Sequence, residues 1–398
     1  DYANACNNLG VTLQELGQLD AAVKSYEQAL AINPDFADAC NNLGITLKDL
    51  GQLDAAVKSY EQALAIKPDY AEAHNNLGNA LQELERLDEA ANSYRKAIAI
   101  DADYAMAHSN LSQALMQQGR LDEAVSSCNK AIDIDPDISE AHTNLGFVLQ
   151  NMEKLDDAVA SYRKALAINP ENIKAEYFLA TLTDKTIKAP PEGFVKLIFD
   201  ERATVFEQRM KEGDSWLPQI VRSAAASLIE QCGLESEHPF ANTLDLGCGT
   251  GRAGVEFRNI ALKLHGVDLS PKMMDRAREK EVYDALFLDD FTNFLEQTEN
   301  IYDLIIAVDS FLYMGPLEAV FTGVVRVLRV GGAFAFTIET TDSSDFALQK
   351  TCHHAHSTGY VHQLAADYGF DVVLCKQIDN MRFGIKGALF WLEKEDYI

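Results

Sequence analysis

The stretch LDLGCGTGRAG, residues 244–254, places four glycines directly after a short apolar run. Two glycine patterns overlap in it. Gly249, Gly251 and Gly254 complete G-x-G-x-x-G, the fingerprint of a dinucleotide site. A second pattern, D-x-G-x-G-x-G, begins at Asp245 and points to another adenosine cofactor. Glycine suits both patterns, because it lets the backbone approach a ligand where a side chain would clash. Only the surrounding sequence can therefore distinguish the two kinds of cofactor.

From about residue 240 onward, short apolar runs alternate with longer amphipathic ones. This alternation predicts a mainly parallel sheet covered by helices on both faces. Ligands of such sheets bind beyond the carboxyl ends of the strands, where we expect the glycine turn and, at the end of the second strand, Asp268. The expected strands span 242–246, 264–269, 284–288, 302–309 and 332–339, and the clearest helices span 270–281 and 316–329.

Three later features separate the two cofactors. Asp289 and Asp290 end the third strand, where a carboxylate can accept the adenine amino group and Phe291 supplies a backbone N–H and apolar cover. Residues 326–339 read as a helix, a Gly-Gly turn and a strand. Residues 371–394 read as two strands with a tight return, and a terminal antiparallel hairpin is typical of class I methyltransferases rather than of nicotinamide domains.

Residues 194–398 therefore resemble class I S-adenosylmethionine-dependent methyltransferases, through LDLGCGTG, GVDLS, LDDF and LRVGG. The resemblance implies an α/β Rossmann-like domain with a seven-stranded, mainly parallel sheet. It also implies S-adenosyl-L-methionine as cofactor, with S-adenosyl-L-homocysteine as product. The residues that it places around the cofactor are Asp245, Gly247, Cys248, Gly249, Gly251, Asp268, Leu269, Met273, Asp289, Asp290, Phe291 and Asp309.

The first half of the chain is organised by a strict period of 34 residues. Asn-Leu recurs at 8–9, 42–43, 76–77, 110–111 and 144–145, and each copy continues much as NNLGITLKDLGQLDAAVKSYEQALAIKPD does over 41–69. The pattern resembles the tetratricopeptide repeat, a helix-turn-helix unit of this length. It predicts an all-α tetratricopeptide superhelix of five repeats over residues 1–172.

Two further positions recur within the repeats. A glycine marks close packing of the two helices of a unit at Gly10, Gly44, Gly78 and Gly146, whereas the fourth copy has Ser112, and Cys128 replaces its aromatic residue. An aspartate suited to capping the second helix lies at Asp20, Asp54, Asp88, Asp122 and Asp156.

A repeated asparagine forms a ladder along one side of the array. Its carboxamide offers both a donor and an acceptor, which matches a peptide backbone, so a peptide or protein held in the repeat groove is one prediction. The alternative is that each side chain only bonds a neighbouring helix. The ladder consists of Asn8, Asn42, Asn76, Asn110 and Asn144.

The repeat pattern breaks near residues 189–193, where two prolines and a glycine cannot continue a helix. We therefore expect a capping helix and linker over 173–193 and the methyltransferase domain over 194–398. Within the latter, a helix over 198–210 is expected to pack Phe199, Val205 and Phe206 against the domain. Together with 307–317 and 354–370, this segment is similar to a bacterial group of predicted tetratricopeptide-repeat methyltransferases related to quinone- and biotin-pathway enzymes.

Methyl transfer to oxygen or nitrogen usually requires a base close to the acceptor. The candidate region follows the fourth strand, at Asp309, Ser310 and Tyr313. A loop after the fifth strand brings three histidines, 353, 354 and 356, toward the same mouth, with His356 the preferred candidate. Adjacent histidines cannot easily converge on one ion, so no metal is expected.

A net charge of −27 repels phosphate backbones and anionic membrane surfaces, which argues against nucleic-acid and membrane partners. Seven scattered cysteines predict reduced thiols and a cytoplasmic protein. The chain begins inside a repeat and without Met, as expected of a fragment.

Three functions remain open from the sequence. One is a methyltransferase whose repeats recruit a peptide or a protein-bound substrate. Another is a small-molecule methyltransferase whose repeats serve only for assembly. The third is a non-catalytic repeat scaffold that binds the cofactor.

Overall fold

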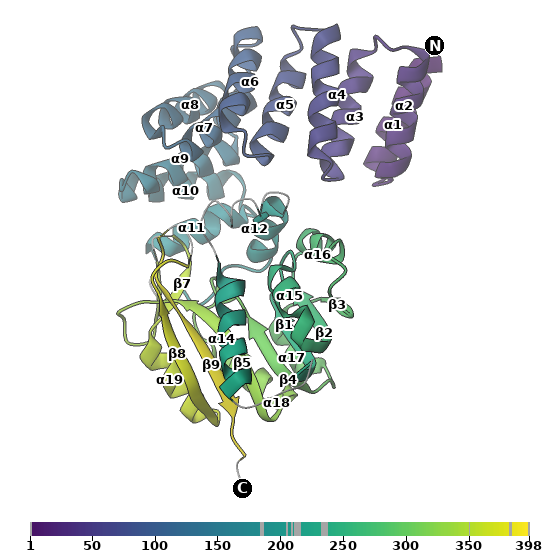
Figure 1. Cartoon of the computed structure of the whole chain (residues 1–398). Coiled ribbons are helices and arrows are strands. Elements are labelled where there is room, and N and C mark those ends of the chain that lie inside the picture. Colours follow the sequence, from purple (N-terminus) through teal and green to yellow (C-terminus); the bar gives the residue numbers. More distant parts are fainter. Residues whose placement is uncertain are drawn as a thin grey trace. The chain divides into compact units, whose positions relative to one another are not determined.

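The computed structural model describes residues 2–183, 187–203, 206–207, 210, 216–231, 238–349, 351–381 and 384–396. The chain divides into two compact units, residues 1–183 and 184–398 (Figure 1). Val205, which was expected to pack against the second unit, lies outside the described residues.

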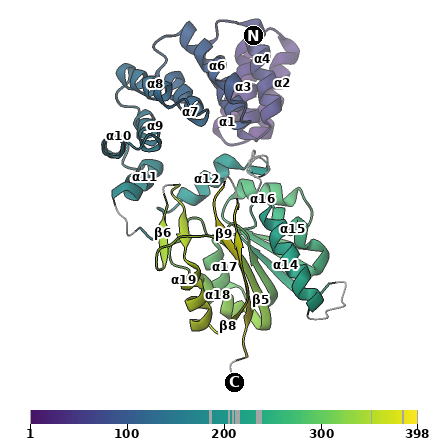
Figure 2. The ribbon, with the colours of Figure 1, turned by 60° about the vertical axis from the view of Figure 1, so that its left-hand side comes forward.

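The first unit consists of helices that pair in chain order, each packing against the next (Figures 1 and 2). This confirms the predicted tetratricopeptide superhelix, and the helix expected after the fifth repeat is α11. The helices are α1 (Tyr2–Glu15), α2 (Leu19–Ile32), α3 (Ala37–Asp49), α4 (Leu53–Ile66), α5 (Ala71–Glu83), α6 (Leu87–Ile100), α7 (Ala105–Gln117), α8 (Leu121–Ile134), α9 (Ser139–Asn151), α10 (Leu155–Ile168) and α11 (Ile173–Thr183).

Each helix pair with a glycine in its first helix packs a tyrosine ring against it. In the second repeat, a Cβ on Gly44 would lie 2.6 Å from the Tyr60 ring, which is fully buried. The same contact recurs at Gly10, Gly78 and Gly146, so the predicted close packing is confirmed. In the fourth repeat, where the glycine is Ser112, the facing residue is the smaller Cys128, and the two side chains interact.

The predicted aspartate caps are wrong. The second helix of the first repeat begins at Leu19, one residue before Asp20, and its N-cap is Gln18, whose side chain makes no capping hydrogen bond. The same arrangement holds in the other four repeats. The aspartates lie in the first turn, where a negative charge favours the helix dipole without closing a cap.

The second unit is built on a seven-stranded sheet of order β3-β2-β1-β4-β5-β9-β8 (Figure 1). Strands β1 to β5 pair in parallel, and β9 runs antiparallel to both β5 and β8, which confirms the predicted sheet and hairpin. The strands are β1 (Phe240–Leu246), β2 (Ala261–Asp268), β3 (Ala285–Leu288), β4 (Tyr302–Ala307), β5 (Leu328–Glu339), β8 (Phe370–Ile378) and β9 (Gly387–Lys394).

Alternate residues of the central strands pack into two separate hydrophobic cores on opposite faces of the sheet. Ile305 of β4 faces a core with α17 (Phe291–Gln297), α18 (Glu318–Val327) and α19 (Thr358–Asp367). Ile306 faces the opposite core, with α14 (Leu217–Gln231) and α15 (Arg252–Phe257) (Figure 2). Because side chains of a strand alternate between faces, the continuous apolar run in β4 is what a sheet covered on both sides requires.

Three local predictions differ from the structure. Gly331 and Gly332 lie inside β5, beside a shift of register against β4, rather than in a turn before the strand. The return between β8 and β9 spans 379–386 and is not a tight turn. The expected histidine loop contains a strand, β7 (His354–His356), which pairs with β6 (Phe346–Leu348) in a second, two-stranded sheet.

Candidate functional site

The glycine turn follows β1 and bends back over β2. The backbone N–H groups of Gly247 and Cys248 both donate to the Val267 carbonyl oxygen, which fixes the start of the turn. Gly247, Gly249 and Gly251 have φ values of 69°, 53° and 85°, a region that favours glycine. A Cβ on Gly249 would meet no atom within 4 Å, so the space over this residue is open to a ligand.

Asp268 ends β2 directly beside this turn. One carboxylate oxygen accepts the N–H of Gly249 at 2.8 Å, and the other accepts the N–H of Ser270 at 2.8 Å. Burial raises the pKa of this carboxyl, whereas these backbone N–H groups lower it. The carboxylate is therefore held in one orientation against the turn, with acceptor capacity remaining on its oxygens.

Asp245 lies under the turn and is almost fully buried. Its Oδ2 accepts a hydrogen bond of 2.7 Å from the hydroxyl of Tyr283, a residue that sequence reasoning missed. Burial and the neighbouring Asp245 raise the pKa of Tyr283, so the hydroxyl keeps its proton and donates. Burial also raises the pKa of Asp245, to about 7.

Gly254 accounts for the overlapping glycine patterns. It lies in α15, where a Cβ would come within 2.3 Å of the Tyr283 ring and hydroxyl. Cβ atoms on Gly251 and Gly266 would also approach this ring, at 3.1 and 3.0 Å. The glycine that completes G-x-G-x-x-G therefore makes room for a tyrosine of the protein itself.

The end of β3 carries the two acids predicted to meet an adenine. Asp290 is exposed and caps α17, since its side chain accepts the N–H groups of Thr292 and Asn293. Asp289 accepts hydrogen bonds from the Asn293 side-chain amide at 2.8 and 2.9 Å. The half-buried Phe291 ring packs near Phe311. Asp290 thus caps a helix, whereas Asp289 does not.

Three other residues of the predicted cofactor set are placed by the core. Cys248 is 5% exposed, and its Sγ lies 3.9 Å from the Met274 sulfur. Met273 is buried in α16 (Pro271–Arg278), and its backbone N–H donates to the Ser270 hydroxyl oxygen at 3.1 Å. Leu269 is half-buried and donates its backbone N–H to Asp268.

The carboxyl end of β4 carries the predicted acceptor region. Asp309 has a φ of 62°, which is strained for a residue other than glycine, and its N–H donates to the Thr337 hydroxyl of β5 at 2.8 Å. Ser310 donates its hydroxyl to the Leu246 carbonyl oxygen, next to the glycine turn. Tyr313 is largely buried and packs edge-on against Phe199 of α12 (Phe194–Arg202).

The histidines do not lie in an exposed loop. His356 is fully buried, and its Nε2 lies 2.8 Å from the Gly315 carbonyl oxygen. Burial lowers the pKa of this imidazole to about 4. His354 is buried as well, with Nε2 3.1 Å from the Ile187 carbonyl oxygen. Both imidazoles thus contact backbone carbonyl groups. His356 was expected to face the mouth of the acceptor region, but its ring is buried against the Gly315 carbonyl oxygen instead.

The third histidine, His353, has a different partner. Its Nδ1 lies 3.0 Å from Oε1 of Glu339, the last residue of β5, and its ring packs edge-on against Tyr313. Sequence reasoning passed over Glu339, because nothing in the sequence marks a strand-end glutamate as the partner of a histidine 14 residues later. The structure thus brings Asp309, Tyr313, Glu339 and His353 together at the ends of β4 and β5.

Segment α12 contacts the start of α16, near the glycine turn. Asp200 accepts the Ser270 hydroxyl at 2.6 Å and the Lys272 N–H at 3.4 Å. These contacts fasten α12 to the start of α16, beside Asp268. Phe199 packs edge-on against Tyr313, in line with its predicted packing role, whereas the Phe206 ring contacts Phe199 itself.

In the first unit, most of the asparagine ladder bonds the preceding repeat. The side-chain amides of Asn42, Asn76 and Asn110 donate to Asn7, Asn41 and Asn75, at 3.0 to 3.1 Å. Asn144 donates to the Ser109 hydroxyl in the same way. The side-chain amide of each of these four asparagines thus bonds the preceding repeat, and that of Asn110 donates a second time, to Asn79 Oδ1 at 3.0 Å.

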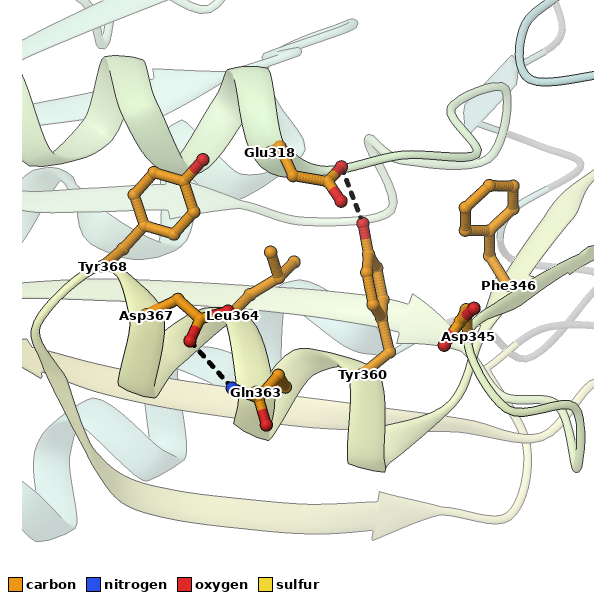
Figure 3. A pocket seen from close by; sticks show the side chains of 8 residues that line it. All are labelled: Glu318, Asp345, Phe346, Tyr360, Gln363, Leu364, Asp367 and Tyr368. Atoms are coloured by element: carbon orange, nitrogen blue, oxygen red, sulfur yellow. Dashed lines mark hydrogen bonds between the residues drawn. The ribbon is translucent and has the colours of Figure 1, made fainter.

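A separate hollow of about 560 Å³ lies between α18 and α19 (Figure 3). It is lined by three carboxylates and three aromatic rings, and two of the carboxylates already bond neighbours: Glu318 accepts from the Tyr360 hydroxyl, and Asp367 accepts from Gln363. None of the residues predicted from the sequence lines it. Over the described ranges, no three His, Cys, Asp or Glu side chains gather as a metal site would require.

Comparison with known families agrees with this architecture. A family model described as a methyltransferase domain matches residues 243–332. Models described as TPR repeat or tetratricopeptide repeat match 12–51, 46–85, 75–137 and 139–172.

Curated relatives of the chain are methyltransferases that match about a quarter to a third of it. The malonyl-[acyl-carrier protein] O-methyltransferase of Salmonella typhimurium is 29% identical over 132 residues, 32% of this chain and 52% of that protein. The sarcosine/dimethylglycine N-methyltransferase of Halorhodospira halochloris is 28% identical over 37% of this chain and 56% of its own. An uncharacterized methyltransferase of Synechocystis sp. is 34% identical over 24% of this chain and 46% of its own. The chain thus spans about half the length of the curated relatives it matches.

Among solved structures, a thermophilic tetratricopeptide protein of Thermus thermophilus is 27% identical, with a TM-score of 0.40, and is matched over 45% of this chain and 98% of its own. Sheet order, terminal hairpin, glycine turn and family matches together define the class: the chain carries tetratricopeptide repeats and a class I methyltransferase domain. None of the described helices is long and apolar enough to cross a membrane.

Proposed function

We propose that the protein is an S-adenosylmethionine-dependent methyltransferase that acts on an oxygen or nitrogen nucleophile. The observation that carries the proposal is the open, left-handed glycine turn with Asp268 fixed beside it. Asp268 can accept hydroxyls of the ribose, Asp289 can accept the adenine amino group, and Gly249 lets the backbone approach the methionine part. These residues suit the chemistry of the cofactor.

The Tyr283 contact supports this cofactor over a dinucleotide. A pyrophosphate would need the third glycine of G-x-G-x-x-G for close packing at the helix start. Here Gly254 is used by the Tyr283 ring, while the carboxylate of Asp268 beside the turn adds negative charge. A cationic sulfonium suits that charge better than a pyrophosphate does.

S-adenosylmethionine, when bound, supplies a methyl carbon activated by its attached sulfonium. The chain has to hold an acceptor in line with that methyl, at about 3 Å, and keep water away from it. Asp309 and Tyr313 border the place where such an acceptor would lie, and Phe199 of α12 covers Tyr313. The strained backbone at Asp309 fits a residue held for function rather than for stability.

We further propose that the repeats recruit a peptide or protein-bound acceptor. The support is the array itself, since stacked repeats present an extended binding surface. The asparagine contacts also fit the alternative role, because each bonded amide holds two repeats in register. A cytoplasmic location and the lack of nucleic-acid and membrane partners stay predictions from charge and thiols.

The test is methyl transfer from labelled S-adenosylmethionine to a panel of acceptors. The panel holds sarcosine, a serine- and lysine-containing peptide library and malonyl-acyl carrier protein. The relatives' names suggest the first and last of these, and recruitment suggests the library. We expect transfer to at least one acceptor, and a loss of peptide transfer, but not of sarcosine transfer, in the Asn76→Ala, Asn110→Ala double variant.

Three outcomes would contradict the proposal in different ways. Cofactor binding without transfer to any acceptor would favour the scaffold that binds the cofactor without turnover. Unfolding of the double variant, monitored by circular dichroism, would assign the asparagines to the register of the array. Equal peptide transfer by residues 187–398 alone would show that the repeats serve assembly only.

A further inference from the structure

The first helix of each repeat belongs to the inner layer of the array. These helices pack against one another from repeat to repeat, α1 with α3, α3 with α5, α5 with α7 and α7 with α9. The asparagine hydrogen bonds between repeats join the same helices. In a curved stack of repeats, the layer whose helices approach one another across repeats lines the concave binding surface.

On α3 and α5, the exposed stripe of this inner layer has a carboxylate at each end. Residues spaced by four, three and four positions share one face of a helix. The stripes consist of Asp38, Asn42, Ile45 and Asp49 on α3 and of Glu72, Asn76, Asn79 and Glu83 on α5. Asp38, Asp49 and Glu72 are exposed, and the others are half-buried. The asparagine ladder thus runs between two rows of acids.

Negative charge on the inner layer is concentrated in the first three repeats. Helices α1, α3 and α5 carry these four acids, Glu15 and a single lysine, Lys48. Nζ of Lys48 lies 3.6 Å from Oε1 of Glu83 and 3.7 Å from Oδ1 of Asp49. By contrast, α7 contains no Asp, Glu, Lys or Arg, and α9 contains only Glu140. Since one lysine cannot balance five carboxylates, this part of the inner layer attracts cations.

The same region contains a buried hydroxyl without a partner. In the first, third and fifth repeats, the tyrosine that packs on the glycine donates its hydroxyl to a glutamine 12 residues earlier, at 2.9 to 3.1 Å: Tyr26 to Gln14, Tyr94 to Gln82 and Tyr162 to Gln150. Lys48 replaces this glutamine in the second repeat, and an ammonium group has no acceptor. The fully buried Tyr60 hydroxyl has no hydrogen-bond partner among the residues that the structure describes.

The Tyr60 hydroxyl lies among carboxylates of both stripes. Burial raises the pKa of Tyr60, and the negative charges of Asp49, Glu83 and Glu72 raise it further. The hydroxyl therefore keeps its proton and requires an acceptor. Because a buried donor that lacks an acceptor costs stability, a ligand that brings one to this place gains affinity.

We infer that the inner layer of the first three repeats binds an extended peptide segment rich in lysine or arginine, whose basic side chains pair with the acids of α3 and α5 and whose backbone accepts the Tyr60 hydroxyl. This inference rests on the proposed recruitment of a peptide by the repeats and names the chemistry of that peptide. A peptide cation that pairs with Asp49 or Glu83 releases Lys48 from them and opens the Tyr60 hydroxyl to a backbone carbonyl group. An acidic peptide would be repelled by the same carboxylates.

Fluorescence anisotropy of the full chain at about 150 mM salt tests the charge pairing. The probe is a labelled peptide of about twelve residues with lysine at every third position and serine or alanine elsewhere. The double variant Asp49→Asn, Glu72→Gln should weaken its binding about fivefold or more, because two ion pairs are lost. The matched control, Glu27→Gln with Glu61→Gln, removes the same charge from exposed positions of α2 and α4. It should change the Kd less than twofold, since salt screens charges beyond about 8 Å.

The hydroxyl contact has its own variant. Tyr60→Phe should weaken binding of the lysine peptide about threefold and leave the midpoint of urea unfolding unchanged, because no hydrogen bond within the protein is lost. Tyr94→Phe is the control, since the Tyr94 hydroxyl bonds Asn79 and Gln82. It should lower the midpoint and leave the Kd within twofold. A Tyr60→Phe protein with a lowered midpoint and unchanged affinity would overturn the contact.

Two further measurements separate this inference from the proposed function. Equal losses in the inner and outer double variants would overturn the inference, as would equal affinity for a peptide with glutamate in place of lysine. S-adenosylmethionine is titrated into the same samples by calorimetry. If the cofactor does not bind, the proposed methyltransferase fails whatever the peptide does; if it binds and the lysine peptide is not preferred, only this inference fails.

Discussion

The hydroxyl of Tyr283 donates a hydrogen bond of 2.7 Å to the buried carboxylate of Asp245, and three glycines from three different segments leave room for its ring. Gly251 belongs to the turn, Gly254 to α15 and Gly266 to β2. One side chain thus links the glycine turn to β1, β2 and α15.

Tyr283→Phe should therefore weaken S-adenosylmethionine binding by about tenfold, because a buried carboxylate loses a hydrogen bond of about 1 to 1.5 kcal/mol where it supports the turn. Isothermal calorimetry measures the change. Tyr302→Phe is the control, since Tyr302 is buried and its hydroxyl lies 3.1 Å from His265 Nδ1 rather than near the turn. Equal losses in both variants would show a general effect on stability.

The raised pKa of Asp245, about 7 because of its burial, predicts a pH dependence of folding. Between about pH 4 and pH 7 the folded protein holds a proton that the unfolded chain has released, so this residue's contribution to stability is lost as the pH rises. Asp245→Asn should remove the effect. In urea unfolding of the cofactor-free protein, its stability relative to the unmodified protein should increase from pH 5 to pH 8. A stability difference between the two proteins that does not change with pH would contradict the raised pKa of Asp245. Trp216 and Trp391, the chain's two tryptophans, both lie in the second unit and report its unfolding.

The glycine–tyrosine contact of the repeats makes a pairwise prediction. Gly44→Ser should cost about 2 kcal/mol through overlap with the Tyr60 ring, and Tyr60→Cys should cost about 3 kcal/mol through the space it leaves. The fourth repeat combines serine and cysteine at these two positions, so the double variant should cost at least about 1 kcal/mol less than the sum.

Urea unfolding followed by far-ultraviolet circular dichroism measures this coupling. The control pairs Gly44→Ser with Tyr26→Cys, because Tyr26 faces Gly10 instead. That pair should add within about 0.5 kcal/mol. Coupling of similar size in both pairs would mean that the facing contact is not its source.

These contacts show why the fold could be predicted from the sequence and where prediction stopped. The 34-residue period and the glycine–tyrosine spacing are local signals, as is the alternation of strands and helices. The strand at His354–His356 depends instead on pairing with Phe346–Leu348, and no periodicity marks so short a pair. The aspartates were misread because a first-turn acid and an N-cap look alike when the helix start is one residue away.

The residues of the candidate site likewise fall into those that the sequence predicted and those that it did not. The turn and Asp268 were predicted because glycine spacing and a strand-end acid are properties of short stretches. Tyr283 and Glu339 could not be found, because their importance comes from partners on other elements: Asp245 for the first and His353 for the second. Tertiary contacts of this kind leave no mark in a single sequence.

The linker offers a prediction about the domain boundary. Gly315 donates its N–H to the Lys188 carbonyl oxygen at 2.8 Å, and His354 faces the Ile187 carbonyl oxygen. A protein of residues 187–398 should therefore be more stable than one of residues 194–398, the boundary predicted from the sequence, by about 2 kcal/mol for two lost hydrogen bonds. Tryptophan fluorescence in urea measures the difference. Equal stabilities would leave the boundary at 194.

The most direct test of the central claim is calorimetric titration of S-adenosylmethionine into the purified protein. We expect one site, loss of binding by at least about tenfold in Asp268→Ala, and unchanged binding in Asp275→Ala, whose exposed carboxylate pairs with Arg278 of the same helix. NAD, titrated in parallel, should give no binding. A folded protein that binds NAD, or that binds neither molecule, would contradict the claim that the glycine turn holds a methyl donor.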